Sequence, residues 1–299
     1  MKTISTRRTF LKQTGIITAA SMVPLTLIPK TSKYKMGLQL FTIRDAMAKE
    51  PLKSIAYARG LGYQDGEIYG YDGENDTYYG IKSKEFKKQL TDLDFTISSG
   101  HYDFSSFFNQ PEDQLMRYVD QCIVGSHNLK SDYITWPWLA PEYRTLDNFK
   151  VLAEKLNTIG ERVNQAGLKF AYHNHDFEFT AYNGLTGYAI LLAETQPDLV
   201  KLQMDMYWVE HSSKKSPATL IAENPGRYVM WHIKDMDKVT RDYSELGNGS
   251  IDYQSLLSNT DKDALQYYYI EQGGNFAVNS MQSITDSAAY FKKHLQQYL

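Results

Sequence analysis

The sequence predicts an α/β protein, a (β/α)8 TIM barrel that forms a single domain. Short apolar or β-rich runs alternate with stretches of helical spacing along the chain after residue 34. Such alternation is typical of a parallel sheet covered by helices. Eight of these units occupy about 265 residues, close to the ~250 residues of an eight-stranded barrel. An open doubly wound sheet would carry a glycine-rich turn after its first strand, and "FTIRDAM" has none.

Each of the eight strands is predicted from a short run rich in apolar, β-branched or aromatic residues. In chain order the runs are "MGLQLFTI" (36–43), "QDGEIYGY" (64–71), "DFTISSGH" (94–101), "SDYITWPW" (131–138), "LKFAYHNH" (168–175), "VKLQMDMYW" (200–208), "YVMWHIKD" (228–235) and "QYYYIEQ" (266–272).

Helix signals lie between these runs. Pro51 opens the first helix, Ser83 caps "KEFKKQLTDL" and Pro111 precedes "EDQLMRYVDQCIV". The longest helix is predicted from Pro141 to Ala166, where Gly167 ends it. Later helices are expected to start near residues 184, 216 and 251, and the last covers 281–299.

The net charge, the cysteine count and the aromatic content of the chain limit the kinds of function that it can have. The chain has 299 residues and a net charge of −3, with no basic patch, so we expect no nucleic-acid partner. The single cysteine, Cys122, excludes an internal disulfide and a thiolate metal cluster. The 23 tyrosines, 13 phenylalanines and 4 tryptophans suit both a core and a sugar site.

Residues 1–30 predict a signal peptide of the twin-arginine type. "TRRTFLK" (6–12) carries Arg7 and Arg8, and the apolar stretch "GIITAASMVPLTLIP" (15–29) follows it. A charged segment before an apolar one is typical of secretory signals, and paired arginines are typical of the twin-arginine type. A Sec signal or a membrane anchor is the alternative. We expect a periplasmic or otherwise exported protein without a stable membrane anchor after signal cleavage, and a barrel domain from residue 35 to 299.

Candidate site residues follow from the barrel, because catalytic groups in this fold lie at the C-terminal ends of the strands. Four of the seven histidines fall at these ends. In chain order the candidates are Gln39, Phe41, Arg44, Glu67, His101, Trp136, Trp138, His173, His175, Glu178, Asp205, His232, Lys234 and Glu271.

Four of these residues come from consecutive strands and could converge on one divalent metal ion. They are His173, Asp205, His232 and Glu271. A mixed nitrogen and oxygen set suits Mn²⁺, Fe²⁺, Co²⁺ or Zn²⁺ better than Mg²⁺ or Ca²⁺. The alternative is a polar network without a metal.

Six motifs resemble the xylose isomerase-like barrels known as sugar phosphate isomerases/epimerases. They are "GLQLFTIRD", "GYQDGEIYGY", "YHNHDFEF", "DMYWV", "HIKDMD" and "IEQGG". The resemblance implies one divalent metal held by a glutamate, an aspartate, a histidine and a second glutamate, which fall on His173, Asp205, His232 and Glu271. It also implies substrate contacts at positions that match Glu67, His101, Glu178 and Lys234.

The chain departs from the family pattern at two positions. His173 stands where the family has its first glutamate, and Trp208 stands where many members carry a histidine. Family epimerases use both glutamates as acid and base, so epimerisation by two glutamates is in doubt here.

These features predict a metal-dependent isomerase or epimerase that acts on a sugar or sugar derivative through an enediolate. Glu271 and His175 are the candidate proton-transfer groups, Lys234 could steady the enolate, and Trp136 could stack on the sugar. A lyase or hydratase of 3-keto-glycosides is the first alternative, and a non-catalytic sugar-binding protein is the second. The partner is then a small carbohydrate. The sequence leaves the oligomeric state open.

Overall fold

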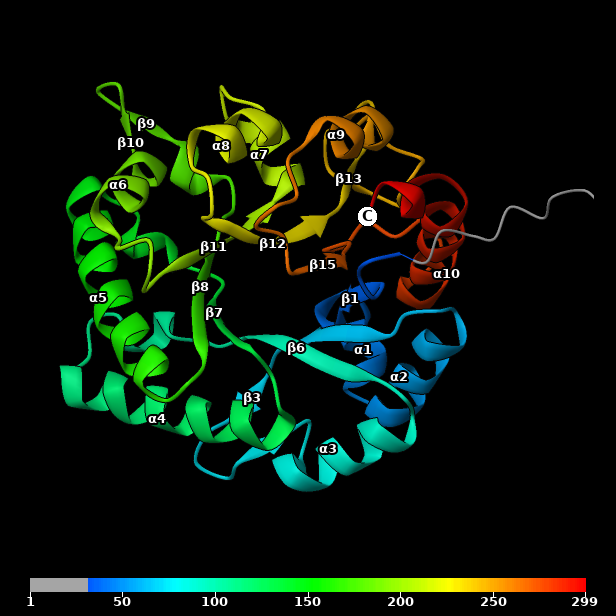
Figure 1. Ribbon diagram of the computed structural model, residues 1–299, viewed down its shortest axis with the longest axis horizontal. Helices are drawn as coiled ribbons and strands as arrows, with labels where there is room; N and C mark the ends of the chain where they lie inside the picture. Colours follow the sequence, from blue (N-terminus) through cyan, green and yellow to red (C-terminus); the bar gives the residue numbers. More distant parts are fainter. Residues whose placement is uncertain (1–31) are drawn as a thin grey trace, which may run out of the picture. The chain divides into compact units, whose positions relative to one another are not determined.

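Residues 32–299, which the computed structural model describes, form a closed barrel of eight parallel strands (Figure 1). This confirms the predicted fold class. Each predicted run contains one barrel strand. The strands are β1 (Gly37–Gln39), β2 (Asp65–Ile68), β6 (Thr96–His101), β7 (Tyr133–Trp136), β8 (Lys169–His173), β11 (Lys201–Asp205), β12 (Tyr228–Ile233) and β15 (Tyr267–Ile270). The predicted signal peptide lies outside the described residues.

Helices surround the strands on the outside of the barrel (Figure 1). They are α1 (Arg44–Met47), α2 (Pro51–Gly60), α3 (Ser83–Asp92), α4 (Glu112–Leu129), α5 (Leu146–Gln165), α6 (Gly187–Glu194), α7 (Met206–Ser212), α8 (Pro217–Glu223), α9 (Tyr253–Asn259) and α10 (Ser280–Tyr290). Within residues 32–299, none of the helices has the length and apolar character needed to cross a membrane.

Alternation along each strand divides the apolar residues between two cores. The larger core joins the outer face of the barrel to the helices and includes Trp136, Phe170 and Trp231. A smaller cluster contains Tyr133, Ala171, Val229, Met230 and Tyr269, from strands on different sides of the barrel. This second cluster fills the barrel interior. Val229 and Met230 are successive residues, and alternation is interrupted there because the pairing of β12 with β11 shifts register at Val229.

Three element boundaries differ from the sequence runs and helix signals. The run for strand six extends to 208, but the strand ends at Asp205, as the strand-end assignment expected, and the Asp205 side chain accepts the N–H of Trp208 and caps α7. The segment from 141 begins with a short 3₁₀ turn, and α5 starts only after Thr145, which caps it. Gly184 lies in a turn with φ of +88°, so α6 starts three residues later.

A fourth boundary differs by one residue. Ser83 is the first residue of α3 rather than its cap, and its hydroxyl donates to Asp76. This contact joins the start of α3 to the loop that precedes it.

Three small antiparallel sheets form within the loops that follow barrel strands. The first comprises β3 (Tyr71–Asp72), β4 (Thr77–Tyr78) and β5 (Ile81–Lys82), after β2. The second pairs β9 (Ala181–Tyr182) with β10 (Leu185–Thr186), after β8. The third pairs β13 (Asp235–Met236) with β14 (Tyr243–Ser244), after β12. All three therefore lie at the C-terminal mouth, where this fold places its sites.

Candidate active site

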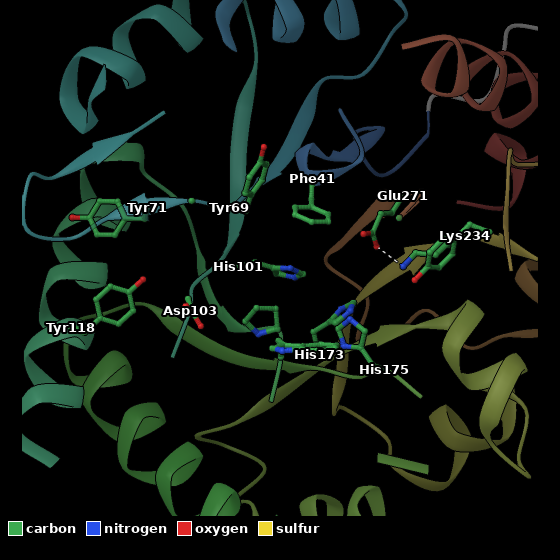
Figure 2. Close-up of a pocket in the computed structure, with 15 residues that line it drawn as sticks. Phe41, Tyr69, Tyr71, His101, Asp103, Tyr118, His173, His175, Lys234 and Glu271 are labelled. Atoms are coloured by element: carbon green, nitrogen blue, oxygen red, sulfur yellow. Dashed lines mark ion pairs between the residues drawn. The ribbon is translucent and has the colours of Figure 1, made fainter. Parts of the chain in front are cut away.

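A cavity of about 470 Å³ opens at the C-terminal mouth of the barrel (Figure 2). Its two ends differ in character. Glu271, Lys234, His173 and His175 lie toward one end, whereas Tyr71 and Tyr118 lie at the other. The lining residues are Phe41, Tyr69, Gly70, Tyr71, His101, Asp103, Tyr118, Pro137, Trp138, His173, His175, Lys234, Tyr243, Glu271 and Gly273.

Glu67 is the centre of a polar layer adjoining this cavity. It is fully buried, and its carboxylate accepts hydrogen bonds from Gln39 and His232 on one oxygen and from Ser99 and Gln203 on the other, at 2.6–2.7 Å. Burial opposes its charge, but positive charge on His101 and His232 prevails and holds the pKa of Glu67 well below its usual value. Glu67 is thus an ionised anchor for the side chains around it.

His173 is held in one orientation by Gln203. The amide group of Gln203 donates to Glu67, so its oxygen faces the imidazoles and accepts from Nδ1 of His173 at 2.8 Å. The same oxygen lies 2.7 Å from Nε2 of His101. Burial, with positive charge on neighbouring groups, lowers the pKa of His173 well below its usual value. His173 is therefore neutral, and its Nε2 is left to face Asp205, 3.9 Å away.

Asp205, His232 and Glu271 form a compact group whose ligand atoms lie within 4.8 Å of one another. His232 lies between two carboxylates, with Nε2 2.6 Å from Glu67 and Nδ1 2.7 Å from Glu271. Burial alone disfavours a charged ring, yet these carboxylates raise the pKa of His232 to about 9. His232 thus carries positive charge in the metal-free protein.

Lys234 lies against the same group. Its Nζ is 2.9 Å from Asp205 Oδ2 and 2.9 Å from Glu271 Oε2, and the side chain is buried. The rings of Tyr207, Trp208 and Tyr243 lie 5.3–5.9 Å from the ammonium, a distance at which cation–π attraction operates. Burial opposes its charge, but the two carboxylates keep the pKa of Lys234 above its usual value.

His175 follows β8 by two residues, and it lines the cavity beside His173, with 4.9 Å between the ring centroids. Its Nδ1 is buried and has no hydrogen-bond partner among the described residues. Burial, followed by the charge of Lys234, lowers the pKa of His175 well below its usual value. The ring is therefore neutral, as a general base requires, and Nε2 rather than the buried Nδ1 is the nitrogen open to the cavity.

Glu178 supports His175 from behind. It is fully buried, accepts the backbone N–H of His175 at 2.9 Å and the hydroxyl of Tyr172 at 2.7 Å, and does not line the cavity. Burial raises the pKa of Glu178 to about 8. The structure therefore places this predicted substrate contact in a supporting position.

The remaining predicted residues divide between the cavity and its surroundings. His101 lines the cavity, whereas Glu67 lies fully buried beside it. Trp136 is fully buried on the outer face of the barrel, against Phe104, and Trp138 lines the cavity instead. Thr135 points inward to Ser99, so Trp136 beside it points outward. Trp138 reaches the cavity because β7 ends at Trp136 and the chain leaves the strand at Pro137.

Sequence reasoning missed Gln203, although a signal for it existed. It lies two residues before Asp205 on β11, so both side chains point to the same face of the strand.

The donor types suit a divalent ion. His173 presents a neutral ring whose orientation Gln203 fixes, as outer partners of metal ligands commonly do. Asp205 Oδ2 is buried and makes no hydrogen bond of good geometry within residues 32–299. For an ion to bind, Lys234 would have to leave both carboxylates, and His232 would have to lose a proton and release Glu67 or Glu271.

The fold and these side chains define a barrel with a polar site at its C-terminal mouth. The chain belongs to the xylose isomerase-like TIM barrel family, whose model matches residues 55–290.

Several solved structures share this fold. A sugar phosphate isomerase/epimerase from Parabacteroides distasonis has 24% identity and a TM-score of 0.76, and the match covers 90% of this chain and 96% of that one. A probable 3-DHS dehydratase from Bacillus anthracis has 11% identity and a TM-score of 0.67, with 86% and 98% covered.

A family protein from Mycobacterium smegmatis, in complex with magnesium, has 15% identity and a TM-score of 0.63, with 89% of this chain and 98% of that one covered. At such identities the likeness shows a shared fold. No match to the chain was found among curated proteins.

Proposed function

We propose that the protein is a divalent-metal-dependent isomerase or epimerase of an unphosphorylated sugar. The observation that carries this proposal is that His173 and Glu271 line the polar end of the 470 Å³ cavity, with the buried Asp205 and His232 next to them. These four residues would hold the ion. When bound, a divalent ion would polarise the substrate carbonyl and stabilise the negative charge that develops on enolisation.

The proton transfers fall to this chain's own side chains. His175 is neutral and borders the cavity, so its Nε2 can remove the proton next to the carbonyl. Glu271, at the same end of the cavity, can take the proton of the substrate's adjacent hydroxyl and deliver it to the neighbouring carbon or to the opposite face, while His175 passes its own proton to the oxygen left negative. The first outcome is isomerisation and the second is epimerisation.

The charge of the cavity supports an uncharged substrate. Among the lining residues Lys234 is the one lysine, no arginine is present, and two carboxylates already neutralise its ammonium. A phosphate group would therefore lack a free cation to bind. The rings of Phe41, Tyr69 and Trp138 instead offer apolar faces on which a sugar can stack.

A lyase or hydratase of 3-keto-glycosides is the second candidate. The aromatic end of the cavity, with Tyr71 and Tyr118, lies away from Lys234 and Glu271 (Figure 2). This end offers room for a leaving group that a simple isomerase would not need. Enolisation at the polar end would then be followed by loss of the β-substituent.

One experiment separates these candidates. The purified protein is incubated in D₂O with Mn²⁺ or Zn²⁺ and a panel of free sugars, sugar phosphates and 3-keto-glycosides, and products are followed by NMR. Deuterium in an isomerised or epimerised free sugar supports the first proposal, and release of the aglycone supports the second. If no substrate takes up deuterium under any metal condition, both enzyme proposals fail and the sugar-binding alternative stands.

A further inference from the structure

Lys234 contacts the same two oxygens that a metal ion would use. Its Nζ lies 2.9 Å from Asp205 Oδ2 and 2.9 Å from Glu271 Oε2, and both carboxylates belong to the group whose ligand atoms lie within 4.8 Å of one another. Figure 2 shows the Lys234 side chain directed at Glu271.

The surroundings of this ammonium hold it in place. The side chain is 3% exposed, and the rings of Tyr207, Trp208 and Tyr243 surround the ammonium at 5.3–5.9 Å. The main chain of Lys234 is also fixed, since its N–H and C=O both bond to the hydroxyl of Tyr253 at 3.0 and 2.7 Å. A lysine held so closely forms a defined part of the site.

The Lys234 ammonium and a divalent ion are both cations, so they cannot occupy the same pair of carboxylate oxygens together. Two carboxylates near one another in a buried site need a cation, because isolated buried charges are costly. The ammonium supplies that charge in the metal-free protein. A second cation at the same oxygens would meet strong repulsion at such short range, since water does not screen it there.

We propose that Lys234 is an internal competitor for the metal: its ammonium holds the Asp205–Glu271 pair in the metal-free protein and must leave when a divalent ion binds. The inference rests on the ligand set of the proposed function. It does not depend on which reaction the protein catalyses. Its consequence is that metal affinity is lower than the four ligands alone would give, and that the metal-free fold remains stable.

The test is titration of Mn²⁺ into the full-length, chelator-treated protein, with free Mn²⁺ read by electron paramagnetic resonance. K234M and K234Q remove the competing charge, and K234R retains it. We expect K234M and K234Q to bind Mn²⁺ at least about tenfold more tightly than the unmodified protein, and K234R to bind no more tightly. If one of the two neutral variants does not fold, the Mn²⁺ affinity of the other one still tests the proposal.

Two further measurements locate the effect. Adding D205N to K234Q should abolish the gain in affinity, because the oxygen pair is then incomplete. In chelator, K234Q should unfold at a lower temperature than the unmodified protein. Addition of Mn²⁺ should raise the unfolding temperature of K234Q to that of the unmodified protein.

Equal or weaker Mn²⁺ binding by both neutral variants would overturn the proposal, and so would a gain in affinity that survives D205N. These outcomes differ from a failure of the proposed function, in which Mn²⁺ binds as expected but no sugar exchanges deuterium.

Discussion

Nδ1 of His173 donates to the side-chain oxygen of Gln203 at 2.8 Å, and this bond determines which nitrogen of His173 faces the cavity. The tautomer follows from the Glu67 carboxylate, which can only accept and therefore orients the Gln203 amide. His173 and His175, two residues apart in the chain, consequently differ in role. One ring is fixed by a bond on its far side, and the other has a free nitrogen.

This difference predicts separate effects of two alanine substitutions. H173A should lower both metal content and activity, because one of four ligands is lost. H175A should keep its metal while turnover falls ~10²–10⁴-fold, the usual contribution of a general acid or base. Metal analysis and steady-state kinetics on both variants check this. Near-normal turnover of H175A with metal in place would remove His175 from the mechanism.

Asp205 should be indispensable for metal binding. D205A should lose most bound metal, since it removes a carboxylate from a buried set of few ligands. D103N is the matched control: Asp103 also lines the cavity but hydrogen-bonds to Ser106 and is not one of the four candidate ligands. Elemental analysis of the two purified variants gives the comparison. Equal metal loss in both would indicate a general disturbance of the cavity.

Trp138 should contribute to substrate binding, and Trp136 should not. Trp138 lines the cavity, and the Arg144 guanidinium packs over its ring at 4.2 Å. W138A should raise KM about 3- to 10-fold, which corresponds to the loss of one stacking contact. W136F should lower thermal stability while KM stays unchanged, because Trp136 packs in the outer core. A KM that rises only in W136F would contradict this assignment.

Glu178 predicts a pH dependence of stability. Burial raises its pKa from an ordinary value of 4.5 to about 8 in the folded protein. The unfolded chain therefore releases this proton first, and the free energy of unfolding falls as pH rises from about 4.5 to about 8. Each unit of the pKa difference corresponds to about 1.4 kcal/mol.

The E178Q variant removes this titration and keeps the side-chain shape. Urea unfolding at pH 5 and pH 8, in chelator, should show a smaller decline for E178Q than for the unmodified protein. Asp65, whose pKa burial raises to about 6, is present in both proteins and cancels in the comparison. Parallel declines would show that Glu178 is already ionised in the folded state.

The N-terminal sequence predicts export by the twin-arginine pathway. Replacing Arg7 and Arg8 with lysine should block export, because the pathway's receptor reads the arginine pair. Cell fractionation followed by immunoblotting detects the change. A variant that still leaves the cytoplasm would be using the Sec pathway.

The strands could be predicted from sequence because each is a short run rich in apolar, β-branched or aromatic residues, a pattern that can be recognised without knowing the rest of the fold. The candidate ligands followed from them, since a barrel brings its strand ends together. Pairings across the barrel could not be predicted. The contacts of Lys234 with Asp205 and Glu271 join three strand ends, and their distances depend on strand register and side-chain rotamers. Alternation alone would place Trp136 and Trp138 on the same face. The end of β7 at Trp136 separates them, and the sequence run did not show where the strand ends.

The three small sheets at the mouth have a consequence for engineering. Tyr71 of β3 and Tyr243 of β14 border the cavity, while the buried charges belong to the barrel strands and the residues that directly follow them. Each small sheet is closed by its own hydrogen bonds and connects to the barrel at strand ends. A library that randomises the exposed positions of these insertions, and keeps the core residues Tyr71 and Tyr78 and the Lys234 contact Tyr243, therefore alters the rim of the cavity and leaves its chemistry intact. Such a library should yield new substrate preferences with few unfolded members.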